Sequence, residues 1–350
     1  MKILYLYVEA MGYTIASIDA LISRGAEVHL VHWQSERLTS YAIPDKEGLF
    51  KYPKDQFNRK TLSEFALDLD PAITVTSGWQ DKMYLSVARD LKKNKKIVVS
   101  GFDGQWTGNF KQHIAAGLGK FDVFKRFFSH AWVAGACQFE YARKLGFDRT
   151  DIIFDLYSAD TLEFNRAYEE SRLKKLHSYP HRFLFVGRLE LVKGIDILLE
   201  AWGILSDQVV HDWELYMVGS GALEKNLESR TDITVKSFIQ PTELAQEVSE
   251  AGCFVLPSRG EPWGVVVHEA ASAGLPIITS NVVGSATSFV IDGFNGFIFQ
   301  SEDASSLAKK MLSIIQASDK DLLDMGEKSG HLAGRITPET SASNLLSILR

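Results

Sequence analysis

The sequence has little cysteine and no long apolar run. Its two cysteines, Cys137 and Cys253, lie far apart in segments that read as buried strands or strand ends, so we interpret them as buried free thiols. This interpretation excludes a disulfide framework and a cysteine-based zinc site. No stretch approaches the roughly 20 apolar residues that a membrane-spanning helix needs. The short apolar run after Met1 meets Glu9 and Gly12, so we interpret it as a buried strand of a cytoplasmic protein and not as a signal peptide.

An excess of positive charge is also missing. The 38 basic and 44 acidic residues give a net charge of −6, which disfavours a duplex nucleic acid as partner. The triplet Asp68-Leu69-Asp70 has the Asp-x-Asp form, but it stands before Pro71. We interpret it as a helix end, and we expect no metal site. With 350 residues, of which 45% are hydrophobic, the chain is long enough for two domains of a soluble enzyme.

Short apolar runs alternate with longer amphipathic stretches along the chain. This alternation predicts an α/β protein with mainly parallel sheets that are covered on both faces. In the first half, the expected strands are Ile3–Val8, Glu27–Trp33, Ile73–Thr76, Ile97–Ser100, Ala131–Ala134 and Ile152–Phe154. In the second half, they are Phe183–Val186, Trp213–Val218, Ile233–Val235, Cys253–Leu256 and Ile277–Thr279.

The alternation stops over a polar stretch in the middle of the chain. We therefore predict two doubly wound, Rossmann-like domains, 1–158 and 182–334, joined by a linker at 159–181. The last helix, 335–350, is expected to pack back on the first domain. Ligands of such sheets bind beyond the carboxyl ends of the strands, so two facing domains would form a deep cleft between them.

The residues that follow the first strand of the second half include two cations. Gly187 allows a tight turn, and Arg188 and Lys193 come next, before a helix that begins near Ile195. A guanidinium group donates two parallel hydrogen bonds and an ammonium group is a point charge, so the pair suits a diphosphate. The alternative is that both are solvated surface cations.

A second small-residue turn follows the next strand. Gly219 and Gly221 would let backbone amides approach a ligand, although a plain tight turn explains the same pattern. Glu224 occupies the third glycine position of the dinucleotide-binding fingerprint. The sequence therefore disfavours a nicotinamide-dependent dehydrogenase.

The most informative segment runs from Pro257 to Pro276. A helix is expected to begin near Gly264, and its free amides offer an anion site. Glu261 precedes this helix and Glu269 lies in its second turn. One carboxylate would bond a sugar and the other a ribose, because a carboxylate accepts well from two neighbouring hydroxyls. A solvated surface charge is the alternative for Glu269, but its apolar neighbours argue against it.

The segments VGRLELVKGID and EPWGVVVHEAASAGLPII resemble family-four retaining glycosyltransferases of the GT-B fold, over about residues 182–300. The resemblance implies that Glu261 bonds the donor sugar, that Glu269 bonds the ribose, and that Arg188 and Lys193 contact the diphosphate. It implies a nucleotide-diphosphate sugar as substrate, with UDP- or GDP-sugars expected, and no permanently bound cofactor. It also implies retention of the anomeric configuration without a metal ion, in the synthesis of cell-surface polysaccharides or glycoconjugates.

The resemblance extends to backbone positions of the donor site. The amides of Trp263, Gly264 and Val265 match those that receive the distal phosphate, and Trp263 replaces a phenylalanine that is commoner there. The segment 235–239, with Phe238, matches the place where the base packs. Gly12 matches a glycine-containing loop near the phosphates, although the usual double glycine is missing.

The first half carries the acceptor side, with fewer matches. Phe102-Asp103 stand where many relatives have a histidine, so Asp103 and His113 are candidate catalytic residues, each with a structural role as alternative. Aromatic and basic residues recur over 79–128, which fits either an ordinary core or a peripheral contact with the inner face of a membrane. The expected acceptor is a glycan, a lipid-linked sugar or a small molecule. A sugar-nucleotide epimerase and a non-catalytic nucleotide-sugar sensor are the alternative functions.

Overall fold

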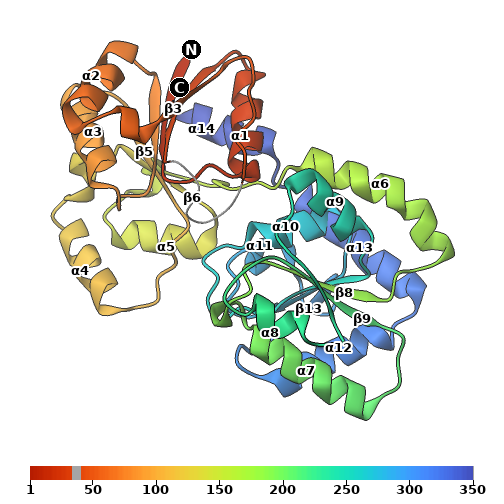
Figure 1. Cartoon of the computed structure of the whole chain (residues 1–350). Helices are drawn as coiled ribbons and strands as arrows, with labels where there is room; N and C mark the ends of the chain where they lie inside the picture. The colour runs from red at the N-terminus through yellow and green to blue at the C-terminus, as the bar shows by residue number, and fades with distance from the viewer. Residues whose placement is uncertain (34–40, 350) are drawn as a thin grey trace. The chain divides into compact units, whose positions relative to one another are not determined.

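The computed structural model describes residues 1–33 and 41–349 (Figure 1). The chain divides into two compact units. Unit 1 consists of Met1–Ser158 together with Ile336–Arg350, and unit 2 consists of Ala159–Arg335. None of the helices in these described ranges is both long and apolar enough to cross a bilayer.

Unit 1 is built on a seven-stranded parallel sheet of order β3-β2-β1-β4-β5-β6-β7. Its strands are β1 Lys2–Tyr7, β2 Glu27–His32, β3 Leu49–Pro53, β4 Ile73–Ser77, β5 Val98–Phe102, β6 His130–Val133 and β7 Ile152–Ile153. Its α-helices are α1 Gly12–Ile22, α2 Arg59–Leu69, α3 Lys82–Lys93, α4 Phe110–Gly119, α5 Ala136–Lys144 and α14 Pro338–Leu346.

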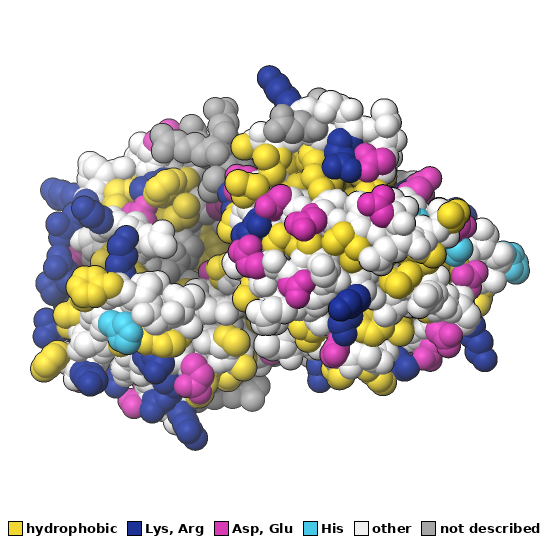
Figure 2. All heavy atoms as spheres, turned by 90° about the horizontal axis from the view of Figure 1, so that it is seen from below, with side chains coloured by type: hydrophobic (Ala, Val, Ile, Leu, Met, Phe, Trp, Pro, Cys, Tyr) yellow, Lys and Arg dark blue, Asp and Glu magenta, His cyan; other side chains and the backbone are white. Residues whose placement is uncertain are grey.

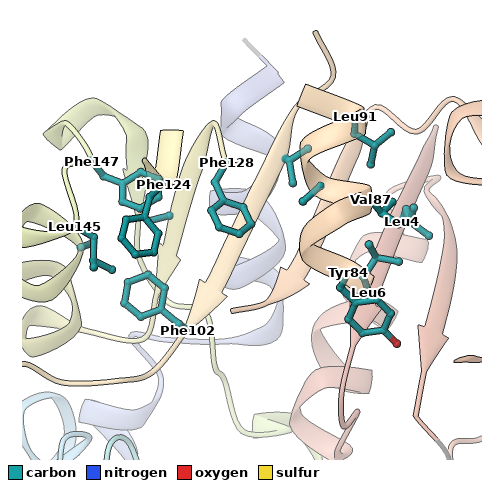
Figure 3. Close-up of a cluster of buried hydrophobic side chains, with 14 of the residues drawn as sticks. Leu4, Leu6, Tyr84, Val87, Leu91, Phe102, Phe124, Phe128, Leu145 and Phe147 are labelled. Carbon is teal, nitrogen blue, oxygen red and sulfur yellow. The ribbon is translucent and has the colours of Figure 1, made fainter. Parts of the chain in front are cut away.

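Both faces of this sheet are buried, because successive side chains of a strand point to opposite faces. In β1, Ile3 and Tyr5 belong to the core cluster that also contains Leu345 of α14. Leu4 and Leu6 point the other way, into a cluster with side chains of α3 and α5 (Figure 3). Helix α14 packs against α1, and Arg24 Nη2 donates to the backbone oxygen of Glu339 at 3.1 Å.

Unit 2 is built on a six-stranded parallel sheet of order β10-β9-β8-β11-β12-β13. Its strands are β8 Arg182–Val186, β9 Glu214–Val218, β10 Thr234–Lys236, β11 Cys253–Leu256, β12 Ile277–Ser280 and β13 Gly296–Phe299. Its α-helices are α6 Thr161–His177, α7 Ile195–Gln208, α8 Glu224–Glu228, α9 Pro241–Ser249, α10 Val265–Ser272, α11 Ala286–Phe289, α12 Ala304–Ile315 and α13 Asp319–Ala333.

Residues 159–181, which we predicted as a linker, form mainly α6, and this helix belongs to unit 2. It packs against α9, α10 and α13. Lys175 is buried and its Nζ donates to the backbone oxygen of Ala251 at 2.8 Å, while Tyr168 lies against Gly274. The segment reads as polar because a long lysine stem and a tyrosine ring cover apolar surface that aliphatic residues usually cover.

The structure contains two strands that the sequence analysis did not predict, β3 and β13. Each lies at the edge of its sheet, where only one neighbouring strand is present. Strand β3 ends at Pro53, whose missing N–H is tolerated at an edge. Cys137 also differs from the prediction, because it is partly exposed in the first turn of α5, whereas Cys253 is a buried free thiol. Asp68 and Leu69 end α2 and Asp70 caps it, as predicted.

Candidate functional site

The loops that follow β8 and β9 run against each other at the carboxyl edge of the unit 2 sheet. The backbone N–H of Gly187 donates to Val218 O, and that of Leu189 donates to Ser220 O, both at 3.0 Å. A Cβ atom on Gly219 would lie 1.9 Å from Gly187 O, and one on Gly221 would lie 2.6 Å from Leu189 O. Close packing of the two loops therefore requires these glycines before any ligand is considered.

Lys193 is placed by a second close approach, between the loop after β8 and the end of β11. Gly194 has a φ of 71°, and a Cβ atom there would lie 2.0 Å from Pro257 O. The N–H of Arg259 donates to Val192 O at 2.9 Å. As a result, Lys193 Nζ forms an ion pair with the carboxylate of Glu261, which lies 68 positions later in the chain. Only 16% of the Lys193 side chain and 11% of the Glu261 side chain is exposed.

Glu261 lies against the start of α10. Ser258 Oγ donates to Glu261 Oε2 at 3.4 Å, and the N–H of Gly284 donates to Glu261 O at 3.1 Å. Gly264 precedes the helix with a φ of 90°, and a Cβ atom there would lie 2.9 Å from Glu261 Cγ. Among the described residues, no side chain caps the start of α10, so its first amides are left for a ligand. Together with Glu261 and Lys193 beside them, these amides form a site for a polar anion.

Trp263 anchors the same loop. Its ring is buried and meets Phe289 edge-on at 6.2 Å between centroids, and its backbone oxygen accepts from the N–H of Ser285 at 2.9 Å. Ser285 Oγ also donates to Gly264 O at 2.9 Å. Trp263 therefore fixes the backbone whose amides we predicted to bind a phosphate. In this chain a tryptophan has that role, in place of the commoner phenylalanine.

The carboxyl group of Glu269 has a raised pKa. It lies in α10 among buried residues, although part of its surface stays open to solvent. Burial, with a smaller contribution from the nearby charge of Asp160, raises its pKa to about 7. A well-solvated carboxylate on a helix surface would keep its ordinary pKa. The structure therefore argues against the alternative of a solvated surface charge.

His268, the residue before it, was not predicted as a site residue. It is fully buried, and its ring stacks on Phe289 with centroids 4.1 Å apart. Its Nδ1 accepts from the N–H of Ala159 at 3.0 Å, and its Nε2 donates to Ala333 O at 3.1 Å. These bonds require a neutral imidazole with its proton on Nε2, and they hold α10 in place within unit 2.

Arg188 and Phe238 lie nearer the surface. About half of the Arg188 side chain is exposed, and its Nη1 pairs with Glu190 at 3.2 Å. Phe238 follows β10, is 38% exposed, and donates its N–H to Ser220 Oγ at 3.2 Å. The roles predicted for both residues stay predictions.

Arg259 lies in the same loop as Glu261, and the sequence analysis did not single it out. Its guanidinium donates to both carboxylate oxygens of Asp196, at 2.5 and 2.7 Å, to Glu302 at 2.9 Å and to Leu191 O at 2.6 Å. It therefore ties the loop after β11 to the loop of Lys193 and to the start of α7. Its partners are 43 to 68 positions away in sequence. The only sequence feature that could have indicated this role is the place of Arg259 just before Gly260 and Glu261.

The predicted residues of unit 1 have separate surroundings. Gly12 is the first residue of α1. Asp103 follows β5, and its charge adds to burial in raising the pKa of Tyr7 and Tyr157. His113 lies on the exposed side of α4, with its ring edge-on to Trp106 at 5.0 Å. The structure thus gives Asp103 buried hydroxyl neighbours and gives His113 an aromatic one.

Comparison with known proteins finds a family match in the C-terminal half and relatives that align with part of the chain. Residues 169–330 match a family model described as glycosyl transferases group 1. An uncharacterized glycosyltransferase of Haemophilus influenzae is 31% identical over 170 residues, 47% of each chain. D-inositol 3-phosphate glycosyltransferase 2 of Catenulispora acidiphila is 32% identical over 167 residues, which are 43% of this chain and 39% of the relative. The aligned part of the chain spans about half or less of the length of these relatives.

Solved structures match the chain over its whole length. Anabaena Alr3699/HepE in complex with UDP-glucose has a TM-score of 0.72 at 17% identity, covering 100% of this chain and 99% of the other. WaaG, a glycosyltransferase involved in lipopolysaccharide biosynthesis, has a TM-score of 0.70 at 14% identity, with the same coverage. At these identities the likeness concerns the fold. It confirms the predicted GT-B class with two Rossmann-like units and parallel sheets.

Proposed function

We propose that this chain is a glycosyltransferase that moves a sugar from a nucleotide-diphosphate sugar to a glycan, lipid-linked or small-molecule acceptor, with retention of the anomeric configuration. The observation that carries the proposal is the Lys193–Glu261 ion pair against the start of α10. It puts a cation, a carboxylate and helix amides in one place, which suits the phosphate and the hydroxyls of such a donor. The family match over residues 169–330 supports it.

The proposal includes the donor roles that the family resemblance implies. Glu261 accepts from hydroxyls of the transferred sugar, and Glu269 accepts from those of the ribose. The amides of Trp263, Gly264 and Val265 receive the distal phosphate, and Phe238 lies beside the base. HepE has been solved with UDP and with UDP-glucose, which supports a UDP-sugar as the donor. A GDP-sugar is the second candidate.

The mechanism is stabilisation of the leaving group. Negative charge grows on the nucleotide diphosphate as the bond to the sugar breaks. Lys193 Nζ has three N–H donors, so it can keep Glu261 and still meet a phosphate oxygen. Arg188 is the second cation, and it leaves its ion pair with Glu190 to bind a phosphate oxygen when the donor is present. The amides at the start of α10 add partial positive charge. In this mechanism the protein supplies the charge, so no metal ion and no permanently bound cofactor is required.

The acceptor is assigned to unit 1, where Asp103 and His113 are the candidate residues, while Gly12 of the same unit is assigned to the donor phosphates. A cytoplasmic location is part of the proposal, because free cysteines fit a reducing compartment. We extend the proposal to the synthesis of cell-surface polysaccharide or glycoconjugate, for which the relation to WaaG is the support.

Product analysis tests the proposal. UDP- and GDP-sugars are incubated with and without a panel of sugar and lipid-linked acceptors, and release of the nucleoside diphosphate is followed. We expect release that depends on an acceptor and is lost in Lys193→Ala, while Lys320→Ala, an exposed lysine of α13, keeps it. An altered sugar nucleotide in the absence of acceptor would show an epimerase. Tight donor binding without release would show a sensor.

A further inference from the structure

Helix α4 carries its large apolar residues on the side that faces solvent. Phe110, Ile114 and Leu118 follow one another at intervals of four, so they share one face of the helix, and Phe121 comes just after its end. Their exposed fractions are 78%, 50%, 45% and 75%. A surface helix of a globular protein normally turns such a stripe toward the core.

The side of α4 that meets the core is made of small residues. Ala115 packs against the buried cluster, and Gly119 is the one buried residue of the helix. A Cβ atom on Gly119 would lie 2.5 Å from the carbonyl carbon of Leu145, so the helix backbone rests directly on the end of α5. The contact holds α4 in its orientation and leaves the stripe outside.

Other aromatic residues of the same region behave in the ordinary way. Phe102, Phe124 and Phe128 are buried in the core cluster behind the sheet (Figure 3). The exposure is therefore confined to the stripe Phe110, Ile114, Leu118 and Phe121. A contiguous exposed apolar surface of this kind marks an interaction site, whereas single exposed apolar residues do not.

The stripe has a basic surround in an acidic protein. Residues 106–129 contain four basic residues and one acidic residue, although the whole chain has a net charge of −6. Lys111, Lys120 and Arg126 are exposed, while Lys125 is engaged by Asp122 and Asp148. On the part of Figure 2 that belongs to unit 1, hydrophobic side chains lie beside many lysine and arginine side chains.

We propose that the stripe and its basic surround dock on the surface of an anionic lipid bilayer. Apolar side chains on one helix face enter the boundary between headgroups and acyl chains, and the lysines meet the anionic headgroups. A second copy of this chain is the other occupant to consider. In a twofold dimer the same basic surround would face itself and repel, so charge complementarity favours the lipid surface.

Vesicle cosedimentation with the full chain tests the proposal. One set of vesicles contains phosphatidylglycerol and phosphatidylethanolamine, and the other contains phosphatidylcholine alone. We expect binding to the anionic vesicles that weakens as salt is raised, since screening reduces the attraction of exposed charges. We expect little binding to the neutral vesicles.

The decisive variant is Phe110→Ser with Phe121→Ser, which should reduce the partition coefficient on anionic vesicles about tenfold or more. The matched control is Leu162→Ser with Leu173→Ser, on exposed positions of α6, and it should bind like the parent chain. Lys120→Glu with Arg126→Glu should also weaken binding, whereas Lys309→Glu with Lys320→Glu should not.

Two results would overturn the proposal. One is equal vesicle binding by the parent chain and the stripe variant, or no binding by either. The other is a parent dimer in light scattering that the stripe variant converts to a monomer, which would make a second copy the occupant. Because the stripe lies in unit 1 and the donor site in unit 2, thermal shift with UDP tells loss of docking from loss of the proposed donor site.

Discussion

At the scale of single residues, the ion pair of Lys193 with Glu261 makes the donor proposal specific. Both residues were predicted for a donor, one for phosphate and one for sugar, and the structure adds that they contact each other. The ammonium group of Lys193 has three N–H donors, so it keeps donors for a second partner beside Glu261. The pair can therefore serve the sugar and the phosphate on its two sides at the same time.

Glu269→Gln gives a pH-dependent prediction at the same scale. The folded-state pKa of about 7 lies above the ordinary 4.5, so between these values the folded chain binds more protons than the unfolded chain. This residue therefore lowers the free energy of unfolding as pH rises from about 4.5 to about 7. We expect Glu269→Gln to gain stability relative to the parent between pH 5 and pH 8 in urea unfolding.

The control for this prediction is Glu250→Gln, an exposed glutamate. Its stability difference from the parent should stay level over the same pH range. If Glu269→Gln also stayed level, the raised pKa of Glu269 would be contradicted.

At the scale of single residues, the sequence predicted the shared sheet edge of residues that follow strands. Glu261, Lys193 and Arg188 all follow predicted strands, so their common edge could be foreseen. Arg259 could not, because its role consists of bonds to Asp196 and Glu302, and no local pattern brings those partners together. Gly219 and Gly221 were explained only in part, since the close approach of the two loops is a tertiary contact.

At the scale of elements, Arg259 is the connection between the loop of Lys193, the start of α7 and the loop after β11. A guanidinium can hold both oxygens of Asp196 and still reach Leu191 O, whereas an ammonium group cannot copy this geometry. We expect Arg259→Lys to weaken UDP binding about tenfold in calorimetry while the circular dichroism spectrum stays unchanged. The reason is that Lys193 loses its fixed position.

Arg166→Lys is the matched control for this prediction. Arg166 makes an exposed ion pair with Glu170 within α6, so the change should leave UDP affinity unaltered. Equal affinities for Arg259→Lys and the parent would remove Arg259 from the positioning of the site.

Every central strand was predicted, and the two missed strands, β3 and β13, are edge strands, although the edge strands β7 and β10 were predicted. Central parallel strands are buried on both faces and read as continuous apolar runs, whereas edge strands are shorter and mixed. In β13, a Cβ atom on Gly296 would lie 1.9 Å from Ile277 O, so the strand begins with a glycine that sequence patterns score against a strand. Helix α6 was hidden for the related reason that its buried face includes Lys175.

At the scale of the whole molecule, each unit has its own sheet and its own core, and the chain returns to unit 1 through α14. Leu345 of α14 is fully buried in the core with Ile18 and Leu21 of α1. We expect Leu345→Ala to lower the free energy of unfolding of unit 1 by about 2–5 kcal/mol in urea, because it leaves a cavity. UDP binding by unit 2 should be unchanged at concentrations of urea below the transition.

Leu349→Ala is the control, since 41% of Leu349 is exposed, and it should cost well under about 1 kcal/mol. A loss of UDP affinity in Leu345→Ala equal to that in Lys193→Ala would show that the donor site does not reside in unit 2 alone.

The proposed donor site at Lys193 and Glu261 is tested most directly by thermal shift and calorimetry. The ligands are UDP, GDP, ADP and CMP, each with and without its sugar, and the proteins are the parent chain, Glu261→Gln and Lys193→Ala. A ligand that binds only the folded state raises its stability. We predict that one nucleoside diphosphate and its sugar raise the melting temperature of the parent, and that Lys193→Ala weakens both while Glu261→Gln weakens mainly the sugar nucleotide. A donor site at Lys193 and Glu261 is contradicted if none of these nucleotides raises the melting temperature of the parent, or if both variants bind them as tightly as the parent does.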